Sequence, residues 1–220
     1  MTKARRYLVA LGTVLVVALG PVLYAVPAQA FNPEFQNARE LVFTISFNRP
    51  LSLDRFWART LGSEYYSVGK VQFYHPGSYR TSCGITDRQL HNAFYCSIDG
   101  NIYMDYHFMQ QIIQTPAYND GAVATIEAHE WGHHIQNLRG WDFPNTLEGV
   151  VTKELMADCF AGIYMRSAYL NHFAKLSDIY EGARILYWFG GGDHGTPKQR
   201  RTAFILGFNH YSVPYCEKNW

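Results

Sequence analysis

The sequence predicts a mixed α+β fold in which a small region of short strands precedes a mainly helical part. Strand-like alternation of apolar and polar residues occurs only before residue 119, and apolar residues at three- and four-residue spacing follow it. Of the 220 residues, 48% are hydrophobic and 17% are charged, which suits one packed core. We therefore expect residues 31–220 to form a single domain.

The first elements are short. Ser52 is a suitable N-cap for a helix that ends before Gly62. Val71–Tyr74 alternates as a strand does and runs into a turn at Pro76-Gly77. A second strand is expected over Asn101–Tyr106.

Four longer helices should follow. The first extends from Asn119 to Gly140, where glycine is a natural helix end, and the second begins at Thr146 or Leu147 and ends near Leu170. The third covers 177–189 and ends at three glycines, and the last follows Thr196-Pro197, since proline is favoured in a first helical turn.

Residues 1–30 have the features of a cleaved export signal. Basic residues precede an apolar run over 8–19, Gly20-Pro21 interrupts it, and Ala28-Gln29-Ala30 provides small residues at the expected cleavage spacing. The alternative is a retained membrane anchor, because Tyr7–Val26 is long enough to span a bilayer. We expect a secreted or cell-envelope protein, with membrane attachment only if this segment is retained.

The four cysteines support the same interpretation. In an exported chain an even number of cysteines favours disulfides, and three pairings are possible. We favour Cys83 with Cys96, which closes a short loop, and Cys159 with Cys216, which would tie the C-terminal tail to a helix. The net charge of +1 and the short basic clusters give no reason to expect a nucleic-acid partner.

The chemistry centres on the pentapeptide HEWGH at residues 129–133. His129 and His133, four positions apart on one helix, project from the same face and can reach one ion. A catalytic zinc site uses three protein ligands and leaves a position for water, so a third ligand must come from elsewhere. The competing interpretation is an amphipathic helix whose histidines form hydrogen bonds in the core.

A second stretch, ELMAD at residues 154–158, supplies the missing group. Glu154 lies 21 positions after His133, far enough for the chain to turn and return as an antiparallel helix. It would complete a two-histidine, one-glutamate site for Zn²⁺, and Asp158 would accept a hydrogen bond from the outer nitrogen of a ligating imidazole. A solvated helix face is the alternative, but the neighbouring residues are too apolar for one. Cys159 points away from this face and is excluded as a ligand.

These residues predict hydrolysis by a metal-activated water. Glu130 is the candidate general base that takes the proton of the water and passes it to a leaving amine. His194 is a candidate for stabilising the oxyanion, and Tyr103 and Tyr106 are weaker ones. We interpret His134 as a structural residue or one that supports the ligands.

An extended peptide needs a surface to bind. The strand over 101–106 precedes the catalytic helix, and we expect an exposed edge there to pair with a peptide substrate through main-chain hydrogen bonds.

Several separated blocks resemble one family. They are AHEWGHHIQNLRG from Ala128, ELMADCFAG from Glu154, His194-Gly-Thr with Gln199-Arg200, and Cys83-Gly84 with 94–96 and 102–105. Together these resemble the putative neutral zinc metallopeptidases of bacteria. The resemblance implies a zincin-like fold, with His129, His133 and Glu154 as ligands and Glu130 as the catalytic residue.

The expected function is that of a zinc-dependent metallopeptidase acting on a peptide or protein substrate. Two alternatives use the same residues: an exported zinc-binding protein without peptidase activity, and a zinc hydrolase acting on a non-peptide amide or a cell-wall cross-link.

Overall fold

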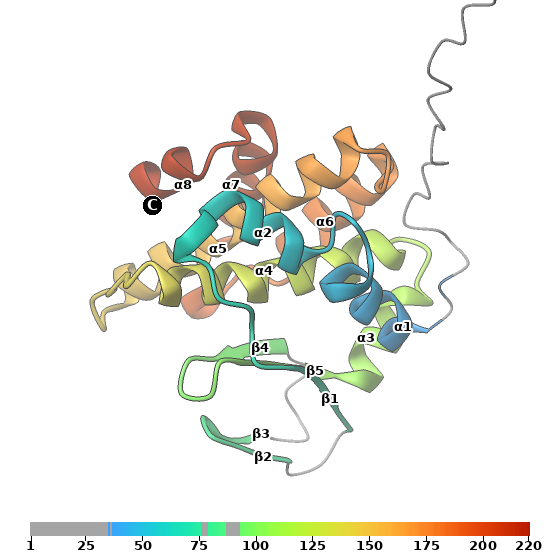
Figure 1. Ribbon diagram of the computed structural model, residues 1–220, viewed down its shortest axis with the longest axis horizontal. Helices are drawn as coiled ribbons and strands as arrows, with labels where there is room; N and C mark the ends of the chain where they lie inside the picture. The colour runs from blue at the N-terminus through green and yellow to red at the C-terminus, as the bar shows by residue number, and fades with distance from the viewer. Residues whose placement is uncertain (1–34, 36, 76–78, 87–92) are drawn as a thin grey trace, which may run out of the picture.

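The computed structural model describes residues 35, 37–75, 79–86 and 93–220 (Figure 1). The predicted signal at 1–30 and the Pro76-Gly77 turn lie outside these residues. None of the described helices is long and apolar enough to cross a membrane. The described chain is mixed α+β, as predicted, with the sheets before the long helices.

Two short helices precede the strands, and the sequence patterns predicted only the second. α1 (Ala38–Phe43) begins at Asn37, whose side chain accepts hydrogen bonds from two backbone N–H groups, and it continues into a π-helical turn, Thr44–Asn48. α2 (Leu53–Leu61) is capped by Ser52 and ends at Gly62, as expected. A 3₁₀ turn, Gly62–Glu64, follows α2.

The strands form two small sheets. β1 (Val71–Tyr74), β5 (Asn101–Asp105) and β4 (Ala93–Cys96) form the larger sheet in the order β1-β5-β4. β5 pairs with β1 in parallel and with β4 antiparallel. β2 (Tyr79–Thr81) and β3 (Gly84–Thr86) form a separate antiparallel pair.

This topology overturns the expectation of a substrate-binding edge at residues 101–106. β5 is the central strand, so its main-chain groups are paired on both sides. The strand also ends one residue earlier than predicted. The side chain of Asp105 accepts hydrogen bonds from the N–H groups of His107 and Phe108, which starts α3 (Tyr106–Ile113) at Tyr106.

Long helices form the rest of the molecule, above the sheets in Figure 1. Four of them are α4 (Asn119–Leu138), α5 (Leu147–Leu170), α6 (Leu176–Trp188) and α7 (Pro197–His210). Their ends lie within two residues of the predicted bounds, where bounds were predicted. α5 is capped by Thr146, and α7 by Thr196, which forms a reciprocal capping box with Gln199. α8 (Val213–Asn219), which was not predicted, ends the chain.

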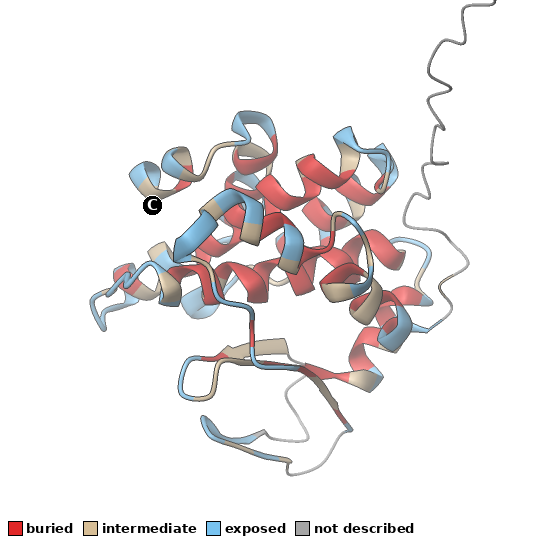
Figure 2. Ribbon diagram, viewed as in Figure 1, coloured by how far each residue is buried: buried red, intermediate tan, exposed pale blue. Residues whose placement is uncertain are grey.

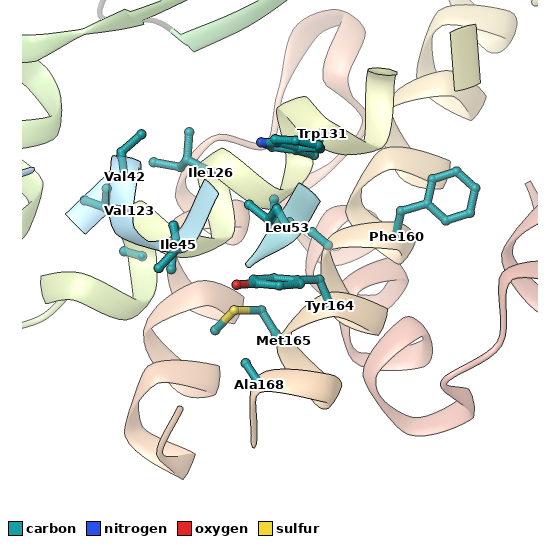
Figure 3. Close-up of a cluster of buried hydrophobic side chains, with 14 of the residues drawn as sticks. Val42, Ile45, Leu53, Val123, Ile126, Trp131, Phe160, Tyr164, Met165 and Ala168 are labelled. Carbon is teal, nitrogen blue, oxygen red and sulfur yellow. The ribbon is translucent and has the colours of Figure 1, made fainter. Parts of the chain in front are cut away.

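The core is centred on α4 and α5, which the N-terminal helices, α6 and α7 cover with further buried residues (Figure 2). Figure 3 shows Leu53, Trp131 and Tyr164, which come from α2, α4 and α5. Trp57 of α2 is fully buried and meets the ring of Phe160 edge to face, 5.6 Å between centroids. This contact packs α2 against α5, the helix that carries ELMAD.

Both disulfides have the favoured pairing. Cys83 bonds to Cys96, which joins the end of the small sheet to β4, and Cys159 bonds to Cys216, which attaches α8 to α5. The second bond also confirms that Cys159 is not a metal ligand.

Candidate metal centre

Three donor atoms meet where α4 and α5 face each other. Nε2 of His129 lies 3.1 Å from Nε2 of His133, and these nitrogens lie 3.2 and 3.3 Å from the two carboxylate oxygens of Glu154. A tetrahedral zinc ion with bonds of about 2.0–2.1 Å separates its ligand atoms by about 3.3 Å. The spacing of the three groups therefore fits the corners of a zinc tetrahedron.

The helix pair makes this meeting possible through a glycine. A Cβ on Gly132 would lie 2.9 Å from the backbone of Ala157, so only glycine permits this approach of the two helices. Gly132 lies between His129 and His133, and Ala157 lies between Glu154 and Asp158. The glycine thus brings the two motifs into register.

The tautomers of both imidazoles are fixed by their outer nitrogens. Nδ1 of His129 donates to Asp158 at 2.8 Å, and Nδ1 of His133 donates to Oε1 of Gln136 at 2.9 Å. With both Nδ1 atoms protonated, the two Nε2 atoms present lone pairs to each other and to Glu154. Such an arrangement needs a positive charge at its centre.

The electrostatics of the site favour that charge. Burial alone would raise the pKa of Glu154, but the imidazoles of His133 and His129 outweigh burial and hold the pKa well below its usual value. Burial lowers the pKa of His129, yet the charge and hydrogen bond of Asp158 outweigh it and raise the pKa to about 10. A proton or a metal ion can supply the positive charge.

Arg200, for which no role was predicted, completes the support of His129. Its guanidinium binds Asp158 through two hydrogen bonds, both 2.8 Å, and the residue is 3% exposed. The pair is bidentate, so it fixes the orientation of the carboxylate as well as its charge. Nη2 of Arg200 also lies 4.0 Å from Glu154.

Gln136 has the corresponding role for His133. Its amide accepts from the imidazole and donates to the backbone carbonyl of Lys153 at 2.6 Å. Lys153 directly precedes Glu154, so the Gln136 side chain links His133 to α5, the helix that carries the Glu154 carboxylate. No role was predicted for Gln136 from the sequence.

Glu130 lies on α4 between the two histidines and is 5% exposed. Its charge contributes to the raised pKa values of Arg200 and of Tyr74 of β1, so the carboxylate lies near both residues.

His194 reaches the same site from the loop before α7. Its Nε2 lies 3.8 Å from Glu154, and its Nδ1 lies 2.7 Å from the carboxylate of Asp193. Gly191 and Gly192 have φ angles of 138° and 58°, which favour glycine, and Gly191 N–H donates to the Gly195 carbonyl to close the loop. The loop glycines thus place the half-exposed imidazole beside the donor group.

The other candidates lie elsewhere. His134 is buried between the hydroxyl of Tyr95 and the carbonyl of Tyr66, so it is structural. The hydroxyl of Tyr103 donates to Asp99. The ring of Tyr106 packs on Phe73 and lies under the guanidinium of Arg39. Neither tyrosine is part of the donor group.

A family model described as "Putative neutral zinc metallopeptidase" matches residues 51–184, more than half of the chain. The chain belongs to this family. The matched stretch contains all three donors, Glu130 and Asp158, whereas His194 and Arg200 lie beyond it.

Curated relatives of this zinc metallopeptidase family member carry no functional name. "Uncharacterized protein YpfJ" of Escherichia coli K12 is 28% identical over 189 aligned positions, which cover 71% of this chain and 66% of the relative. "Uncharacterized protein Rv2575" of Mycobacterium tuberculosis is 34% identical over 97 positions, 40% of this chain and 32% of the relative. This chain therefore spans less than two thirds of either protein. No solved structure matches it.

Proposed function

We propose that the chain is a zinc-dependent metallopeptidase that hydrolyses peptide bonds with Glu130 as general base. The observation that carries the proposal is the convergence of His129, His133 and Glu154 at zinc-ligand spacing, with Glu130 between the two histidines. This donor set, two imidazoles and one carboxylate, is one that catalytic zinc sites use.

A zinc ion bound by these three groups would lower the pKa of a bound water towards about 7 and polarise a substrate carbonyl. Glu130 takes a proton from the attacking water and then transfers it to the leaving amine. Asp158 and Gln136 hold the imidazoles, so neither histidine rotates during this transfer. Each residue therefore has one task.

His194 would stabilise the oxyanion that develops on the substrate carbonyl. Its Nε2 is oriented towards Glu154, and Asp193 holds its Nδ1, which leaves Nε2 as the donor that faces the site when the ring is protonated. The side chain is 49% exposed, so a substrate can approach it from solvent.

Two further parts of the proposal concern the whole chain. Residues 31–220 would form one exported domain after removal of the signal at 1–30, and the two disulfides are consistent with an oxidising compartment. N-terminal sequencing of the mature protein tests this. A mature chain that begins at Met1 would contradict it.

The decisive experiment measures zinc per chain and the cleavage of an unfolded protein such as reduced casein. Wild type should bind one zinc ion and cleave the substrate. Glu130→Gln should bind the same amount of zinc and cleave at least roughly 100-fold more slowly. His194→Ala should also retain zinc and lose roughly 100-fold in kcat, the effect of removing an oxyanion donor.

The other outcomes separate the alternatives. Full zinc occupancy with no cleavage by wild type or Glu130→Gln would exclude peptidase action and support a zinc-binding protein. Cleavage of a non-peptide amide or a cell-wall cross-link, but no peptide, would identify a different zinc hydrolase. Equal cleavage by both proteins would exclude Glu130 as the base.

A further inference from the structure

A second group of potential ligand atoms lies at the other end of α4. Asp120, in the first turn of α4, faces Asp178 and Glu181 in the first half of α6, and one oxygen of each lies within 4.8 Å of the others. Asp120 and Asp178 are each 3% exposed, and Glu181 is partly buried. This carboxylate cluster is made of oxygen donors alone.

One carboxylate oxygen of Asp120 lacks a partner among the described residues. Oδ1 of Asp120 accepts the Gly121 N–H, but Oδ2 is buried without any hydrogen bond among the described residues. A buried, unpaired carboxylate oxygen is destabilising unless a charge or donor compensates it. Its own carboxylate neighbours cannot donate while they are ionised.

The cluster is held in place by packing that leaves little freedom. A Cβ on Gly121 would lie 2.4 Å from the Cα of Asp178, so the two helices are in backbone contact at this point. Gly121 N–H also donates to Glu181 at 3.1 Å, and Asp178 accepts from the Lys175 N–H and the Ser177 hydroxyl. The three carboxylates are therefore preorganised.

Nearby cations do not fully compensate the three carboxylates. Lys175 favours the ionised forms of Asp120 and Asp178, but its side chain is exposed and its bond to Asp178 comes from the backbone. Arg184 acts on Glu181, yet its guanidinium binds the carbonyl of Ala117. Burial, with the charge of Asp178 adding to it, raises the pKa of Asp120 to about 6, as expected where compensation is incomplete.

We propose that Asp120, Asp178 and Glu181 form a binding site for a hard divalent cation of the calcium class, which joins the first turn of α4 to α6. Oxygen-only donors suit Ca²⁺, whose remaining coordination positions can be filled by water or backbone carbonyls. The bound ion would supply the partner that Oδ2 of Asp120 lacks. This site is independent of the proposed peptidase activity.

The test uses the full mature chain loaded with one equivalent of zinc, in buffer freed of calcium by a chelating resin. Calcium chloride is titrated calorimetrically, and thermal unfolding is followed with and without it. Wild type should bind one Ca²⁺ with a Kd on the order of 10–100 µM and unfold several degrees higher in 2 mM calcium. Asp120→Asn should bind at least roughly tenfold more weakly while keeping its zinc.

The controls make every outcome decisive. Glu148→Gln removes an exposed carboxylate at the start of α5 and should bind calcium as wild type does. If Asp120→Asn does not fold, Glu181→Gln replaces it, since its amide oxygen still accepts from Gly121. Calcium that neither binds nor stabilises wild type would overturn the proposal. So would equal binding by wild type and the cluster variants, which would place the ion elsewhere.

Discussion

The two ends of α4 carry donor clusters that differ in their atoms and in their surroundings. At the C-terminal half, two imidazoles and one carboxylate converge, and the outer atoms of the imidazoles are hydrogen-bonded to Asp158 and Gln136. At the N-terminal turn, three carboxylates converge, and one oxygen of Asp120 has no partner among the described residues.

Both clusters depend on the same packing device. Gly132 lets α5 approach α4 at the first cluster, and Gly121 lets α6 approach it at the second. The close approach explains why donors meet, but it does not decide which ion they would hold. The donor atoms decide that, because imidazole nitrogen suits zinc and carboxylate oxygen suits calcium.

The largest expected effect comes from replacing the carboxylate of the first cluster by an amide. The same replacement in the second cluster is the control. Glu154→Gln should lower zinc affinity by roughly 100-fold or more, because the amide supplies no charge to the ion. Glu181→Gln should leave zinc affinity within about twofold, since it lies in the other cluster. Competition with a chromophoric chelator measures both. Unchanged affinity in Glu154→Gln would assign the third ligand to another residue.

A smaller effect is expected from the support of His129. Arg200→Lys keeps the positive charge but loses the two-bond fork on Asp158, so zinc affinity should fall about tenfold. Arg201→Lys changes the adjacent, exposed arginine and should have no effect. The same chelator competition compares them. If both variants bind zinc like wild type, Asp158 holds the imidazole without help from the guanidinium.

The donors that share a helix, or two helices joined by one short loop, were accessible from sequence. His129 and His133 follow from helical spacing, and Glu154 from its position after a single turn of the chain. The family match and the geometry agree with the predicted α+β class, and the Ser52, Thr146 and Thr196 caps show why the helix starts were predictable.

Contacts between distant segments were not accessible in this way. Arg200 meets Asp158 across 42 positions, and a single arginine on a helix gives no spacing signal. The parallel pairing of β1 with β5 was not predicted, because no turn pattern in the sequence marks the connection between parallel strands. A free edge on β5 was expected for that reason. The carboxylate cluster was missed for the same reason, since Asp120 and Asp178 lie on helices separated by α5.

Glu127 lies on α4 between the two clusters and shows what burial alone does to a carboxylate there. It is fully buried, and its Oε1 accepts from Ser46 and from the indole of Trp131. Burial raises the pKa of Glu127 to about 7, in contrast to Glu154, where the two imidazoles lower the pKa. The opposite shifts follow from the presence or absence of a nearby positive charge.

The variant Glu127→Gln tests this effect of burial through the pH dependence of the free energy of unfolding. The folded pKa lies above the unfolded value of about 4.5, so wild type loses stability as the pH rises from about 4.5 to 7. The variant does not titrate at this position, so its free energy of unfolding relative to wild type should rise by about 2 kcal/mol between pH 5 and pH 8. Urea unfolding of both proteins at equal zinc content measures the difference. A difference that is constant with pH would show that Glu127 stays ionised in the folded protein, and burial would then not be the dominant influence on this carboxylate.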